Sequence, residues 1–72
     1  MEKVKMPEAV KMEVGCKVSW FYYASEAEAR VAGEIFRQEA VVKAQQGYDF
    51  GYQVPGYGGA VKSQGLWYAV SP

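Results

Sequence analysis

The longest regular pattern in the chain is an alternation of apolar and polar positions between residues 10 and 23. Side chains of a strand point alternately to its two faces, so this period of two predicts a strand with one buried face. The even positions are predicted to face the core, Cys16 among them. The odd positions begin polar and become aromatic at Phe21 and Tyr23. We therefore expect one strand over residues 10–23 whose second face is aromatic at one end.

A helix is predicted over residues 26–46. Ser25 followed by Glu28 has the spacing of a capping box, in which the two side chains satisfy amides at the helix start. Gly47 has the position and the residue type that end many helices in the left-handed conformation. Between these signals, charged residues fall on one side of the helix and apolar residues on the other, which is typical of a helix packed on a sheet.

Three further strands are predicted after the helix, over residues 48–54, 60–62 and 66–70, with a turn at Ser63–Gly65. The order strand, helix, strand, strand, strand indicates an α+β fold. We expect a single small domain over residues 9–72, in which one helix packs on one face of a largely antiparallel sheet of three or four strands. Residues 1–8, which are charged and contain Pro7, are predicted to form a flexible N-terminal arm.

One helix can cover only one face of such a sheet, and the other face is predicted to carry Phe21, Tyr23 and Trp67. An open aromatic face usually marks an interaction site. We expect these three side chains, with Tyr57 in a neighbouring turn, to anchor a protein partner. Lys3 and Lys5 in the arm are expected to order when the partner binds.

The composition of this chain of 72 residues excludes several ways of stabilising a small fold and several functions. A single cysteine allows no internal disulfide, and the absence of histidine leaves no metal site, so we expect neither metal nor cofactor. Eight basic and eight acidic side chains give zero net charge, which argues against nucleic acid as a partner. No run reaches the roughly 18 apolar residues that a membrane span needs. The unpaired cysteine fits a cytoplasmic protein.

Catalytic chemistry is not expected either. General acid–base catalysis usually needs histidine or paired carboxylates, and the glutamates here fall mostly on the helix, where surface roles account for them. Cys16 is predicted to be a buried, inert residue of the first strand. The glycines at 56, 58 and 59 lack the Gly-Lys-Ser/Thr sequence of a phosphate-binding loop. The chain is therefore predicted not to be an enzyme.

The segment Gly47–Val54 is similar to the aromatic strand with which RNA-recognition domains stack bases. It departs from that pattern at Gln46, where a basic residue belongs, and at Asp49, which is acidic. We expect its three aromatic side chains to face the helix and belong to the core. These are Tyr48, Phe50 and Tyr52.

In its size, its single helix on an antiparallel sheet and its segment Gly47–Gly56 (GYDFGYQVPG) before a tryptophan-containing last strand, the chain resembles small host-takeover proteins of bacteriophages. The resemblance implies a protein that binds and inhibits or redirects a bacterial machine, such as RNA polymerase or a defence complex. It brings no catalytic residues with it.

Three functions are compatible with the sequence. The first is a non-enzymatic protein-binding module, a phage-type inhibitor or regulator that acts by steric occlusion. The second is a homodimer formed through the open sheet face, in which each copy covers the other. The third is a binder of single-stranded nucleic acid that stacks bases on its tyrosines.

Overall fold

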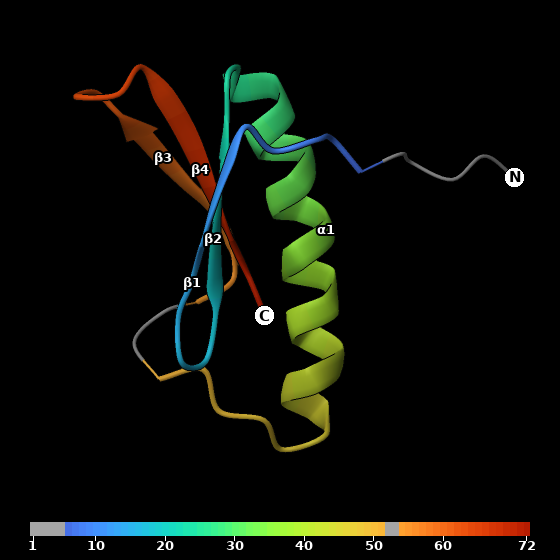
Figure 1. Ribbon diagram of the computed structural model, residues 1–72. Coiled ribbons are helices and arrows are strands. Elements are labelled where there is room, and N and C mark those ends of the chain that lie inside the picture. Colours follow the sequence, from blue (N-terminus) through green and yellow to red (C-terminus); the bar gives the residue numbers. More distant parts are fainter. Residues whose placement is uncertain (1–5, 52–53) are drawn as a thin grey trace, which may run out of the picture.

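The computed structural model describes residues 6–51 and 54–72 (Figure 1). Their elements are, in chain order, β1 (Lys11–Val14), β2 (Ser19–Tyr23), α1 (Glu26–Gln45), β3 (Gly56–Val61) and β4 (Leu66–Ser71). The four strands form one antiparallel sheet in the order β1-β2-β4-β3. The helix lies along one face of this sheet (Figure 1), which confirms the predicted α+β class with one helix on one side.

The strand predicted over residues 10–23 is instead a hairpin of two strands. The chain turns back at Cys16 and Lys17, and the amide of Gly15 donates to the carbonyl of Val18 at 2.8 Å to close the turn. Cys16 is exposed in this turn, so the prediction that it is buried is wrong. A regular alternation cannot distinguish one long strand from two short ones, because a two-residue turn interrupts it only briefly.

The hairpin also exchanges the faces of the sheet between its two strands. Met12 lies opposite Phe21 and Glu13 lies opposite Trp20, and directly opposed residues share a face. Even positions of β1 therefore lie on the same side as odd positions of β2. The prediction that even positions face the core throughout residues 10–23 is wrong for this reason.

Both ends of α1 are capped as the sequence predicts. The Ser25 hydroxyl accepts a hydrogen bond from the Glu28 amide at 3.2 Å. At the other end Gly47 takes a φ of +91°, and the Tyr48 amide donates to the carbonyl of Lys43 at 3.0 Å. This pair of features is a Schellman motif, which satisfies carbonyls that the helix itself leaves free. Local signals thus determine where the helix begins and ends.

Residues 48–51 and 54, predicted as part of a strand over 48–54, lie in the connection from α1 to β3, and residues 52–53 are outside the described part. The Asp49 carboxylate accepts the Gly51 amide at 2.8 Å, and Gly51 has a φ of +70°, which a strand does not permit. Tyr48 is exposed and Phe50 half-buried, which corrects the prediction of core positions for these two; Tyr52 lies outside the described residues.

The core lies between α1 and the helix-facing side of β2, β3 and β4. The buried residues of α1 are small apart from one ring: Ala29, Ala32, Gly33, Phe36 and Ala40. Phe36 meets Phe21 of β2 with ring centroids 5.2 Å apart. Small residues let the helix lie close to the sheet, and the Cα atoms fill a slab only 15 Å thick. Among the described residues, α1 makes no contact with β1.

Helix and sheet approach each other closely where Gly33 faces the start of β3. A Cβ atom at this position would lie 2.4 Å from the backbone nitrogen of Tyr57, which is closer than real Cβ atoms approach. Glycine in a helix interior costs about 1 kcal/mol relative to alanine. The close backbone approach explains why this chain keeps glycine there.

Candidate functional site

The face of the sheet that α1 leaves uncovered carries three half-buried aromatic side chains. Trp20 and Tyr22 come from β2, and Tyr68 comes from β4 opposite Tyr22. Lys11 and Glu13 of β1 lie on the same side, opposite Tyr22 and Trp20. We call these five residues the aromatic face.

Charged groups of β1 hold the centre of the aromatic face in place. The Tyr22 hydroxyl donates to the Glu13 carboxylate at 2.6 Å, and the Lys11 ammonium lies 5.0 Å from the Tyr22 ring centroid. The hydrogen bond to Glu13 raises the pKa of Tyr22, and burial adds to this. The Tyr22 and Tyr68 rings are 6.2 Å apart at their centroids. The face is therefore an ordered cluster of rings with both charge signs at its β1 side.

Two glycines make room for rings of the aromatic face. A Cβ atom at Gly58 would lie 2.2 Å from the Tyr68 ring, and one at Gly15 would lie 2.6 Å from the Trp20 ring. Gly58 is the extra residue where the β3 register shifts between Tyr57 and Gly59. The two rings thus pack closely against the backbone at these glycines.

Three of the predicted anchors lie on the opposite side of the sheet from the one predicted, and Tyr57, predicted in a turn, lies in β3. Tyr23 is fully buried in the core, and Phe21 packs on Phe36. Trp67 and Tyr57 are half-buried and pack against the same core. The expectation that Phe21, Tyr23 and Trp67 form the open face is therefore wrong, while Lys3 and Lys5 lie outside the described residues.

The sequence contains a signal that could have identified the correct residues. Strands usually run 3–10 residues, so an alternation over residues 10–23 is long enough to suggest a turn within it. Gly15 marks the place. A two-residue turn there assigns Phe21 and Tyr23 to the helix side, and leaves Trp20 and Tyr22 on the open face.

Tyr57 takes part in a polar cluster at the edge of the helix side. Its hydroxyl donates to the Glu26 carboxylate at 3.0 Å, and Arg30 donates to the same oxygen at 3.2 Å. The Arg30 guanidinium lies 4.5 Å from the centroid of the Tyr57 ring. These hydrogen bonds, the one from Tyr57 foremost, lower the pKa of Glu26. The cluster links the first turn of α1 to the start of β3.

We expect Tyr57→Phe to raise the pKa of Glu26 toward its ordinary value, because the largest cause of the lowering is then absent. A carboxyl whose pKa is lower in the folded chain stabilises the fold at neutral pH, and this contribution is lost as the pH falls through its titration. Titration of the Glu26 side-chain carboxyl by carbon-13 NMR measures the change. Identical Glu26 titrations in the two proteins would contradict the assignment.

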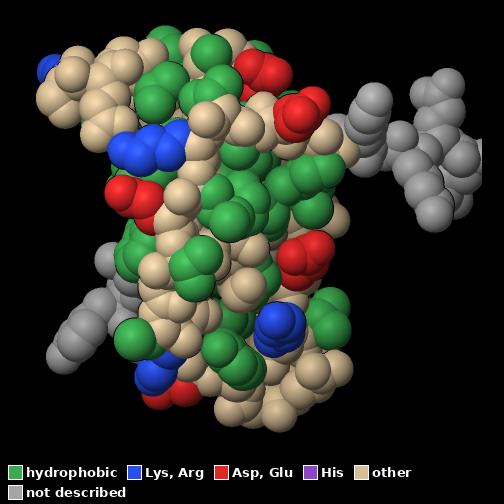
Figure 2. Space-filling model, in the orientation of Figure 1, with side chains coloured by type: hydrophobic (Ala, Val, Ile, Leu, Met, Phe, Trp, Pro, Cys, Tyr) green, Lys and Arg blue, Asp and Glu red, His purple; other side chains and the backbone are tan. Residues whose placement is uncertain are grey.

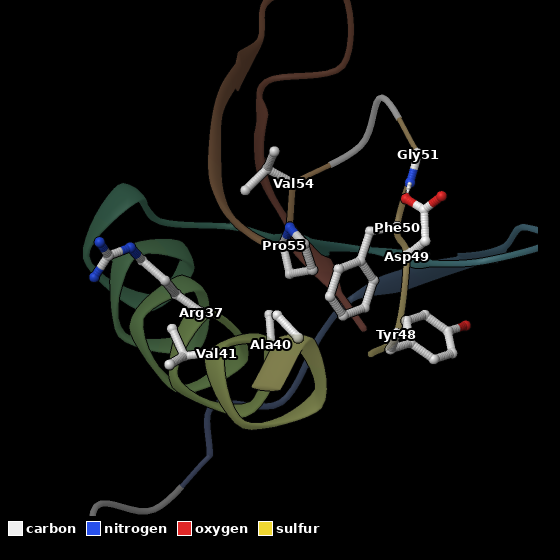
Figure 3. A pocket seen from close by; sticks show the side chains of 10 residues that line it. Arg37, Ala40, Val41, Tyr48, Asp49, Phe50, Gly51, Val54 and Pro55 are labelled. Carbon is white, nitrogen blue, oxygen red and sulfur yellow. Dashed lines mark hydrogen bonds between the residues drawn. The ribbon is translucent and has the colours of Figure 1, made fainter. Parts of the chain in front are cut away.

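A hollow lies between the last turns of α1 and the connection to β3 (Figure 3). It has a volume of about 410 Å³, and Ala40 and Val41 line it on the helix side. Phe50 and Pro55 line it on the loop side, where the Phe50 ring stacks at a tilt on Tyr48 with centroids 4.6 Å apart. Asp49 is the one carboxylate among the described lining residues, and none of these is a histidine.

The described residues contain no group of three or more cysteine, histidine or acidic side chains that could hold a metal ion. Within residues 6–51 and 54–72, no helix has both the length and the apolarity that crossing a membrane requires. The chain was compared with protein-family models, curated proteins and solved structures, and none of them matches it. The geometry of the chain itself is therefore the basis for its functional assignment.

Proposed function

We propose that the chain is a non-enzymatic protein-binding module whose aromatic face contacts the partner. The observation that supports this is the cluster of Trp20, Tyr22 and Tyr68 on the sheet face that α1 leaves uncovered. Tryptophan and tyrosine supply large contact areas with few rotatable bonds, and they are enriched among the residues that dominate binding energy.

The proposed mechanism is steric occlusion by a rigid surface. The Tyr22–Glu13 hydrogen bond and the close packing of Tyr68 over Gly58 fix the rings before binding, so little conformational entropy is lost when a partner docks. Lys11 and Glu13 would lie at the rim, where charges contribute to specificity more than to affinity. The resemblance to phage host-takeover proteins suggests a component of a bacterial machine as the partner and the cytoplasm as the compartment.

Capture from a bacterial lysate tests the aromatic face when wild-type and variant chains are immobilised side by side. We expect Tyr68→Ala to lose the captured protein, since truncating a central anchor costs about 2 kcal/mol or more in binding. Tyr48→Ala is the matched control, because it removes an exposed tyrosine outside the aromatic face. Far-UV circular dichroism checks that both variants fold.

Three outcomes would count against the proposal. Equal capture by wild type and Tyr68→Ala would exclude the aromatic face. Loss in Tyr48→Ala alone would locate binding at the hollow beside α1 instead. Capture that disappears when the lysate is treated with nuclease would indicate the nucleic-acid alternative, with bases stacked on the aromatic rings.

A further inference from the structure

Strand β1 forms one edge of the sheet, and within residues 6–51 and 54–72 its apolar side chains Met12 and Val14 are left exposed. Among the strands that the structure describes, β2 is its one neighbour. Met12 and Val14 point to the side where α1 lies, yet α1 contacts only the other strands, and these two side chains are 54% and 75% exposed. Figure 2 shows hydrophobic side chains exposed over β1 and beside α1 on this side of the molecule. An exposed edge strand presents unpaired backbone groups with which a strand of another chain can pair.

The backbone hydrogen-bonding groups on the free edge of β1 belong to Met12 and Val14, the residues whose side chains are exposed. Gly15 and Val18 form a hydrogen-bonded pair that closes the hairpin. In an antiparallel ladder such pairs alternate with non-bonded ones, so the backbone groups of Glu13 and Lys11 point toward β2. Those of Met12 and Val14 point away from the sheet. An incoming antiparallel strand can therefore bond directly to Met12.

The residues from Val10 to Val14 read Val-Lys-Met-Glu-Val, which is symmetric about Met12 except that the charge changes sign. We propose that β1 pairs antiparallel with β1 of a second copy, with Met12 opposite Met12 on a two-fold axis. In this register Lys11 of each copy lies opposite Glu13 of the other, and the two Met12 residues exchange both backbone hydrogen bonds. The inference concerns the strand edge and does not rest on the proposed function of the aromatic face.

Charge disfavours the neighbouring registers. Opposed residues must share a face, so the strands can shift only in steps that keep even positions opposite even positions. One step in either direction places Lys11 opposite Lys11 or Glu13 opposite Glu13, and like charges directly opposite destabilise a pair. The charged pairs of the proposed register occupy non-bonded positions, where side chains are closest, with Cα atoms about 4.5 Å apart.

The contacts within one chain are compatible with this pairing. Lys11 and Glu13 already lie 3.9 Å apart along β1, so two copies would form a ring of four alternating charges. The amide of Val10 donates to the Tyr22 carbonyl at 2.8 Å, and this bond ends the pairing of β1 with β2 within one chain. Lysine on an edge strand usually prevents pairing. In the proposed register, however, Lys11 of each copy lies opposite Glu13 of the other copy. The dimer would join two sheets into one, with both aromatic faces on the same side.

Charge reversal tests the register. In sedimentation equilibrium from about 10 μM to about 1 mM, wild type should approach twice the chain mass of 8.0 kDa. Lys11→Glu should weaken association at least about tenfold, because both charged pairs become repulsive. Glu13→Lys should do the same, and the double variant Lys11→Glu/Glu13→Lys should restore it. Tyr68→Ala, which alters the aromatic face but not the edge, should associate as wild type does.

A second readout locates the interface without a substitution. The backbone amides of Met12 and Val14 should become protected from hydrogen exchange as the wild-type concentration rises, whereas the Gly15 amide is bonded at all concentrations. A wild-type mass equal to that of a single chain at every concentration in the sedimentation experiment would overturn the inference. So would single reversals that associate like wild type, a double variant that stays monomeric, or loss of association in Tyr68→Ala alone.

Discussion

Replacing Gly33 with alanine is expected to lower the free energy of unfolding by about 2 kcal/mol. Adding a methyl group to a tightly packed site costs about 3 kcal/mol, and the better helix propensity of alanine returns about 1 kcal/mol. The cost falls at the upper end of its range because the group that must move is the backbone of Tyr57, which a Cβ atom would approach to 2.4 Å. Backbone in a paired strand cannot rotate away as a side chain can.

Urea denaturation followed by far-UV circular dichroism measures this change. Glu39→Ala is the control, since Glu39 is exposed on the same helix and its replacement should alter stability by less than about 0.5 kcal/mol. A Gly33→Ala chain that is as stable as wild type would show that α1 and β3 can move apart without a cost in the free energy of unfolding. A more stable one would mean that helix propensity outweighs packing at this position.

Phe36→Ala is expected to have the largest effect of any single truncation in α1, about 3–5 kcal/mol. Its side chain is 5% exposed and fills the space between the helix and Phe21, with ring centroids 5.2 Å apart. Alanine would leave a cavity that the small neighbours on α1 cannot fill. A chain of 72 residues is stable by roughly 7 kcal/mol, so about half of that stability would be lost.

Thermal unfolding compares Phe36→Ala with Val31→Ala, a truncation in the same helix at a position 38% exposed. The control should lose less than about 1 kcal/mol, because little apolar area is withdrawn from water there. Comparable losses in the two variants would mean that the core does not centre on the Phe21–Phe36 contact. Retention of the wild-type transition in Phe36→Ala would contradict the described packing directly.

The sequence predicts the helix well and the strands less well, for a physical reason. The ends of α1 depend on groups within five residues of each other, such as Ser25 with Glu28 and Tyr48 with Lys43. The strands depend on partners far along the chain. Residues 48–54 have an alternating pattern, yet the described part of this segment is a loop, because Gly51 takes a positive φ. Alternation alone does not supply a neighbouring strand.

The candidate site follows the same division. An aromatic face on the side away from α1 could be predicted, because one helix covers one face and the chain has more rings than a small core requires. Which side chains belong to that face could not be predicted, since this depends on whether residues 10–23 contain a turn. One two-residue turn moves Phe21 and Tyr23 into the core and Trp20 and Tyr22 out of it.

The turn at Cys16 and Lys17 is short, and this limits which mutations the chain can accept there. Cys16 and Lys17 are both exposed, so many residue types would fit at these two positions. A single inserted or deleted residue would instead rotate β1 by half a turn relative to β2 and bring Met12 where Lys11 and Glu13 now lie. Substitutions are therefore expected to accumulate in this turn among descendants of the chain, while its length should stay constant.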